Sequence, residues 1–132
     1  MTTEKKFRIL IVDDDAFIQN MYVTKFTKSG HEIIVAKNGQ EALARLKDET
    51  LPTPDAVLLD VVLPGMDGLQ ILAQARQENL APSAKYIMLT NQADEAEVEG
   101  AKKLGVAGFI VKAAVTPSEV VTKVLEILGA EA

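Results

Sequence analysis

The chain has 132 residues, 48% of them hydrophobic and 25% charged, which is typical of one folded domain with its own core and not of a disordered segment. Fourteen basic against 19 acidic residues give a formal charge of −5, which argues against a general nucleic-acid-binding surface. The absence of cysteine excludes disulfides and thiolate metal sites, and the short apolar runs and polar first six residues favour a cytoplasmic protein without membrane insertion.

Short apolar runs alternate with stretches of helical period along the whole chain, which predicts five strand–helix units. The expected strands cover 7–12, 31–36, 56–59, 85–90 and 107–111. The expected helices cover 16–28, about 38–51, about 68–79, 94–104 and 117–128. Because right-handed crossovers leave few other arrangements, this alternation predicts a parallel sheet with helices on both faces. Periodicity alone leaves the strand order open.

Capping residues support several of these helices. Asp15 and Asp67 fit the N-cap position, and Thr116, Pro117 and Glu119 form a capping-box sequence with proline at the first helical position. In the first helix we expect the apolar residues to face the core, and these are Phe17, Ile18, Met21, Tyr22 and Phe26. The helix over 94–104 is expected to be the weakest, because Gly100 interrupts it and the apolar residues in it or just before it offer little to bury, and these are Ala93, Ala96, Val98 and Ala101.

The most informative stretch is Ala56 to Asp60 and the turn that follows it. Four apolar residues predict a strand buried on both faces, and Asp60 stands at its carboxyl end. Pro64, Gly65 and Gly68 then force a tight turn. Ligands and chemistry gather at this edge of open α/β sheets, so we interpret Asp60 as a phosphoryl acceptor.

Other polar side chains follow the remaining strands at the same edge, and these are Asp13, Asp14, Thr90 and Lys112. Three carboxylates at about 4 Å would repel by roughly 4 kcal/mol per pair at an effective dielectric near 20, so we expect a cation among them. Oxygen-only ligands favour Mg²⁺. A phosphoryl donor beside Asp60 would then be attacked in line, with its charge met by Mg²⁺, Lys112 and the Thr90 hydroxyl.

These residues resemble a known family. The set Val12-Asp13-Asp14, Leu59-Asp60, Leu63-Pro64-Gly65-Met66-Asp67-Gly68, Leu89-Thr90 and Phe109-Ile110-Val111-Lys112 is similar to the receiver domain of two-component response regulators. The resemblance covers about residues 7–129 of a single domain spanning 1–132. It implies a flavodoxin-like (βα)₅ fold with strand order 2-1-3-4-5.

The resemblance also implies a function and a role for each site residue. A sensor histidine kinase or phosphotransfer protein would phosphorylate Asp60, and the protein would catalyse its own phosphorylation and dephosphorylation. Asp14, Asp60 and the Val62 carbonyl would bind Mg²⁺ directly, and Asp13 through water. Thr90 and Lys112 would hold the phosphoryl oxygens.

The implied output involves Phe109, which would rotate when Thr90 moves. The fourth helix, fifth strand and fifth helix would then signal to an unidentified protein target, with no direct nucleic-acid contact, and a phosphorylation-linked dimer is an open outcome. Because the chain ends within a few residues of its last helix, we expect output by protein contact, unless the chain was cut from a longer protein.

Three residues depart from the family's habit: Val62 is apolar, Asn91 is large, and Ala113 replaces a proline that usually follows a cis bond. Since cis costs about 2.5–4 kcal/mol without proline, we expect Lys112-Ala113 to be trans.

Taken singly, each site residue has an ordinary structural interpretation, as a cap, a turn residue, a surface charge or part of the core. Three rival functions also remain. A phosphatase of the haloacid dehalogenase type would use Asp13 in an Asp-x-Asp motif, and the other rivals are a flavin binder and a pseudo-receiver that docks partners without phosphorylation. His31 has no partner for catalysis in the sequence and is interpreted as a surface residue at a strand end.

Overall fold

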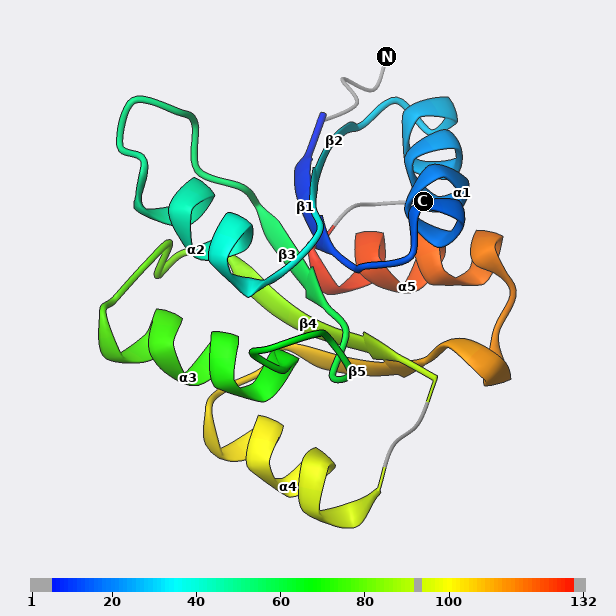
Figure 1. The fold of residues 1–132 in the computed structure, drawn as a ribbon. Coiled ribbons are helices and arrows are strands. Elements are labelled where there is room, and N and C mark those ends of the chain that lie inside the picture. The colour runs from blue at the N-terminus through cyan, green and yellow to red at the C-terminus, as the bar shows by residue number, and fades with distance from the viewer. Residues whose placement is uncertain (1–5, 92–93, 130–132) are drawn as a thin grey trace.

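Strands and helices alternate strictly along the chain in the computed structural model, which describes residues 6–91 and 94–129 (Figure 1). The elements are β1 (Arg8–Val12), α1 (Ala16–Lys28), β2 (Glu32–Ala36), α2 (Gly39–Lys47), β3 (Ala56–Leu59), α3 (Gly68–Gln77), β4 (Lys85–Thr90), α4 (Glu95–Lys103), β5 (Gly108–Val111), a 3₁₀ turn η1 (Lys112–Ala114) and α5 (Pro117–Ile127). This confirms the predicted alternation. Ala93, predicted to precede the fourth helix, lies outside the described residues.

The five strands form one parallel sheet in the order β2-β1-β3-β4-β5, which confirms the expected topology. In the register, Val12 at the end of β1 lies beside Leu59 at the end of β3. The residues that follow these two positions, Asp13 and Asp60, therefore leave the sheet side by side. β3 is the central strand, paired with β1 and β4, and all four of its residues are buried, so Asp60 directly follows the middle strand of the sheet.

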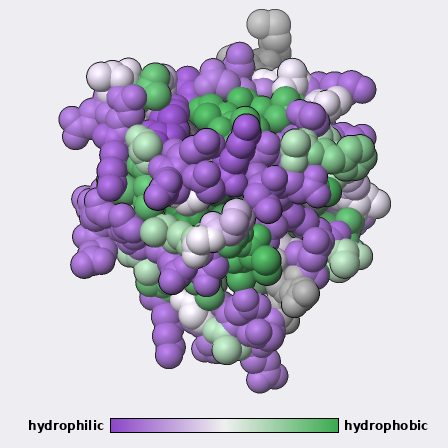
Figure 2. Space-filling model, viewed as in Figure 1, coloured by the Kyte–Doolittle hydropathy of each residue, from purple (hydrophilic) through white to green (hydrophobic). Residues whose placement is uncertain are grey.

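Helices cover both faces of the sheet, with α1 and α5 on one side and α2, α3 and α4 on the other (Figure 1). Because side chains alternate along a strand, Leu10 and Val12 enter the core under α2 and α3, whereas Ile9 and Ile11 pack against α1 and α5. Hydrophilic side chains dominate the outer surface in the view of Figure 2, with hydrophobic ones scattered between them. No helix within the described residues is long and apolar enough to cross a membrane.

The predicted caps are present. Asp15 accepts hydrogen bonds from the main-chain N–H groups of Phe17 and Ile18, and Asp67 and Thr116 each form a capping box. These local bonds satisfy N–H groups that a helix start leaves free and fix where each helix begins. Because a helix has 3.6 residues per turn, the residue at which it begins determines which of its side chains face the sheet.

The predicted orientation of Phe17 was wrong. Phe17 is 77% exposed, and the buried positions of α1 are Gln19, Tyr22 and Phe26. Spacings of three and four residues keep those three on one side of the helix, whereas Phe17 is about 200° away from Gln19 at 3.6 residues per turn. The prediction followed apolar character and therefore placed a polar residue, Gln19, outside the buried stripe.

Helix α4 is held by few apolar contacts, as expected. Ala101 is its only fully buried residue, Val98 is half-buried and Ala96 is exposed. Gly100 faces the side chain of Leu69 on α3, with room left between them. The helix therefore rests on its neighbours through small side chains.

Candidate functional site

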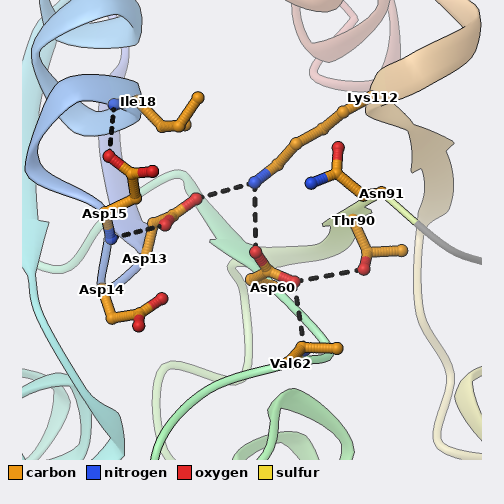
Figure 3. Close-up of a pocket in the computed structure, with 9 residues that line it drawn as sticks. All are labelled: Asp13, Asp14, Asp15, Ile18, Asp60, Val62, Thr90, Asn91 and Lys112. Atoms are coloured by element: carbon orange, nitrogen blue, oxygen red, sulfur yellow. Dashed lines mark hydrogen bonds and ion pairs between the residues drawn. The ribbon is translucent and has the colours of Figure 1, made fainter.

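A pocket of about 260 Å³ opens at the carboxyl edge of the sheet (Figure 3). It is lined by Asp13, Asp14, Asp15, Ile18, Asp60, Val62, Thr90, Asn91 and Lys112. These residues lie at or just after the carboxyl ends of β1, β3, β4 and β5, with Ile18 from the first turn of α1, and parallel pairing brings those strand ends to one edge. The structure thus brings together all five side chains that the sequence nominated for phosphoryl chemistry.

Asp60 is at the centre of the pocket and is 9% exposed. Its Oδ1 accepts hydrogen bonds from the Val62 main-chain N–H at 3.0 Å and from the Thr90 hydroxyl at 3.1 Å. Its Oδ2 lies 3.1 Å from the Lys112 ammonium. These contacts fix the carboxylate while leaving it in the lining of an open pocket, where it can act as a nucleophile.

Lys112 bridges two acids that are far apart in sequence. Its Nζ lies 2.7 Å from Asp13 and 3.1 Å from Asp60, and its side chain is almost completely buried between them. Burial acts to lower the pKa of Lys112, but the Asp13 hydrogen bond and the charges of Asp60 and Asp13 outweigh it and raise the pKa above its ordinary value. Lys112 is therefore a fixed cation in this pocket at neutral pH.

The turn after Asp60 requires glycine for a steric reason. A Cβ added at Gly68 would lie 2.2 Å from the Asp60 carbonyl oxygen and 3.0 Å from the Met88 side chain. The Gly68 N–H meanwhile donates to the Val61 carbonyl oxygen at 3.0 Å. The start of α3 therefore packs directly against the backbone of Asp60, and no side chain fits between them.

The donor set of the pocket suits Mg²⁺. All candidate ligand atoms are oxygens, and the carboxylates of Asp13, Asp14 and Asp60 with the Lys112 ammonium give a formal net charge of −2. Within the described residues no three acidic or histidine side chains converge closely enough to hold a metal by themselves.

The bond between Lys112 and Ala113 is trans, because the described residues contain no cis peptide bond, and this confirms the prediction. Lys112 begins the 3₁₀ turn η1, from which its long side chain reaches back over the sheet edge. The local penalty for a non-prolyl cis bond is thus avoided without moving the ammonium away from the acids.

Phe109 and His31 lie away from the acids. Phe109 is half-buried on β5 and packs against the core under α2, α3 and α4, and its role in a switch stays a prediction. His31 was expected at the surface, but it is half-buried, and its Nδ1 accepts a hydrogen bond from the Phe7 N–H at 3.0 Å. This bond joins the starts of β1 and β2, so His31 has a structural contact here.

Sequence reasoning missed two residues near the site. Ile18 lines the pocket, and buried Gln19 contacts the backbone below it. The signal for Gln19 was available: it is three residues before Tyr22 and seven before Phe26, on the stripe that the helix buries.

Comparison with known proteins gives consistent similarities. The family model for the response regulator receiver domain matches residues 9–125. A protein-glutamate methylesterase/protein-glutamine glutaminase of Bacillus licheniformis is 38% identical over 108 residues, which are 80% of this chain and 29% of that protein. The alkaline phosphatase synthesis transcriptional regulatory protein PhoP of Bacillus subtilis is 34% identical over 121 residues, which are 92% of this chain and 48% of that protein.

Solved structures are similar as well. A CheY-like response regulator receiver domain protein of Methanospirillum hungatei superposes with a TM-score of 0.84 at 30% identity, covering 95% of each chain. The chain spans less than half the length of the two curated relatives named above.

Proposed function

Because this chain belongs to the response regulator receiver domain family, we propose that Asp60 accepts a phosphoryl group from a phosphohistidine. The observation that carries the proposal is the arrangement around Asp60: a carboxylate at the floor of an open pocket, with a lysine ammonium and a threonine hydroxyl bonded to it. A nucleophile and two charge-stabilising donors then share one small space.

The proposed reaction moves one phosphoryl group between two residues. An Asp60 carboxylate oxygen attacks phosphorus, a P–O bond forms, and the P–N bond of the phosphohistidine breaks in line with it. The imidazole keeps the electron pair of that bond and leaves neutral if its other nitrogen carries a proton. Lys112 and Thr90 already donate to Asp60, so small movements bring both donors to the phosphoryl oxygens.

Mg²⁺ is the proposed cofactor, with Asp14, Asp60 and the Val62 carbonyl as direct ligands and Asp13 acting through water. When bound, it neutralises charge on the phosphoryl group. The oxygen-only donors and the net negative charge of the pocket support this assignment.

The proposed phosphodonor is a protein, either a sensor histidine kinase or a phosphotransfer protein. Val62 lines the mouth of the pocket and is 65% exposed, and Phe17 is exposed on the first turn of α1. Apolar side chains beside an acidic pocket suit contact with a partner's surface that presents a histidine. A cytoplasmic location, where such kinases act, stays a prediction.

The proposed output surface is formed by α4, β5 and α5. A phosphoryl group adds about −1.5 to −2 charge near neutral pH, which would draw Thr90 and Lys112 toward Asp60. Phe109 is only half-buried, and α4 has one fully buried residue, so both can change position at low cost. The target of this surface is proposed to be a protein, and dimerisation upon phosphorylation is a variant of the same output.

The phosphatase alternative finds less support. Both carboxylate oxygens of Asp13 are engaged, Oδ1 by the Asp15 N–H and Oδ2 by Lys112, and Asp15 caps α1. Such a phosphatase would also leave the place of Asp60 in the same pocket unexplained. Against a flavin, three acids follow β1 where a flavin phosphate would need a loop rich in serine, threonine and glycine.

The test is phosphorylation by a small donor. The protein is incubated with MgCl₂ and phosphoramidate, and intact mass and peptide mapping locate the adduct. We expect one phosphoryl group on Asp60 and none in Asp60→Asn, because an amide is a far weaker nucleophile. An adduct on Asp13 would favour the phosphatase, and no adduct at all would favour the pseudo-receiver.

A further inference from the structure

Gln19 is a buried polar side chain that the proposed phosphoryl chemistry leaves unused. It is 6% exposed on α1, and its side-chain amide donates to two main-chain carbonyl oxygens, that of Asp13 and that of Ala36, the latter at 3.0 Å. Asp13 directly follows β1, and Ala36 is the last residue of β2. Because both partners are acceptors, the site requires a group with two N–H donors, which the glutamine amide supplies.

The Asp13 carbonyl belongs to the peptide unit that also carries the Asp14 N–H. A peptide unit is planar, so fixing the direction of its carbonyl also fixes the direction in which the next Cα lies. The preceding amide is fixed as well, because the Asp13 N–H donates to the Ala36 carbonyl oxygen at 3.1 Å. Gln19 therefore closes a ring of hydrogen bonds around the backbone that leads into Asp14.

Asp14 depends on this backbone more than its neighbours do. The Asp13 and Asp60 carboxylates are each held by Lys112, but Asp14 is exposed (Figure 3). Within the described residues its carboxylate accepts no hydrogen bond and joins no ion pair. Its position relative to the pocket is thus set by the peptide unit that Gln19 holds.

We propose that Gln19 is a positioning residue for the divalent cation: through the Asp13–Asp14 peptide it aims the Asp14 carboxylate into the pocket. The inference rests on the proposed function, because it assumes that Asp14 binds Mg²⁺. Gln19 itself does not touch the cation. Its effect on phosphorylation follows from its effect on cation binding.

The experiment compares the Mg²⁺ affinity of the full chain with that of Gln19→Met, which keeps the length of the side chain and removes both donors. MgCl₂ is titrated into ¹⁵N-labelled protein at a temperature where both proteins are folded, and amide shifts give the dissociation constant. We expect the affinity to fall by about tenfold or more, as for other residues that orient metal ligands. If Gln19→Met does not fold, Gln19→Asn replaces it, since its shorter amide cannot reach both carbonyls.

Tyr86→Phe is the matched control. It also removes a side-chain donor to a main-chain carbonyl, the 2.7 Å bond from Tyr86 to Leu80, in a part of the chain that does not line the pocket. It should lower the melting temperature and leave the Mg²⁺ affinity unchanged. A general loss of stability would instead weaken Mg²⁺ binding in both variants.

A double-mutant cycle separates positioning from a merely structural role. If Gln19 acts through Asp14, then Gln19→Met in an Asp14→Asn background should cause no further loss of Mg²⁺ affinity. Equal affinities of Gln19→Met and the wild type, or additive losses in the double variant, would overturn the inference while leaving the proposed function intact. A wild-type protein that binds no Mg²⁺ would overturn both.

Discussion

Replacing Gly68 by alanine should disrupt the acceptor loop, although the change adds one methyl group. The added Cβ would lie 2.2 Å from the Asp60 carbonyl oxygen, more than 1 Å inside an ordinary contact, which begins near 3.4 Å. The obstacle is backbone and cannot rotate away, so either α3 or the Asp60 peptide must shift. Overpacking of this kind costs about 1–3 kcal/mol, and we expect the upper end because the clash is with main chain.

Gly100→Ala is the matched control for this prediction. Its Cβ would meet only the Leu69 side chain at 3.7 Å, an ordinary contact, and alanine is favoured over glycine inside a helix by about 1 kcal/mol. The same substitution should therefore stabilise the protein at Gly100 and destabilise it at Gly68.

Urea unfolding and phosphoramidate labelling test the pair. In urea, the free energy of unfolding of Gly68→Ala should be lower than that of the wild type by about 3 kcal/mol. In a thermal scan the same change corresponds to a fall in melting temperature on the order of 10 °C. Labelling of Asp60 should also slow, because the shift moves the nucleophile relative to Lys112. A Gly68→Ala protein as stable and as readily labelled as the wild type would refute the steric argument.

Three further predictions concern charge and movement. Lys112→Met should slow labelling of Asp60 by about 10²-fold or more, measured by intact mass over time, because one donor to the transferring group is lost; labelling at the wild-type rate would contradict that role. The free energy of unfolding in urea should fall as pH rises above about 10. The pKa of Lys112 is raised above 10.5 in the folded protein, so its charge stabilises the fold fully below pH 10.5, and this stabilisation is lost as pH rises through the folded-state pKa. Burial raises the pKa values of Tyr22 and Tyr86 above 10.0, so their ionisation at high pH also favours the unfolded chain. Hydrogen exchange with a phosphoryl mimic should change over Glu95–Leu104 and little in α3, and equal protection with and without the mimic would count against the proposed switch.

Local patterns were sufficient for much of the fold. The buried run Ala56–Leu59, the turn with Pro64 and Gly65, and the N-cap at Asp67 each depend on residues adjacent in sequence, so composition and spacing predicted them. The position of Asp60 at a strand end followed from the same signals. The strand order required the family resemblance, because periodicity says how a strand is buried and not which strand lies beside it.

What the sequence determined by itself was therefore the succession of elements and the set of polar residues at one edge of the sheet. Tertiary structure alone decided that Lys112 pairs with Asp13, 99 residues away, and which main-chain carbonyls the buried Gln19 amide meets. Those contacts depend on how helices and strands from distant parts of the chain are placed against one another. A buried polar side chain is stable only where such placement supplies its partners, and here the carbonyls of Asp13 and Ala36 meet Gln19 only after β1, β2 and α1 have packed together.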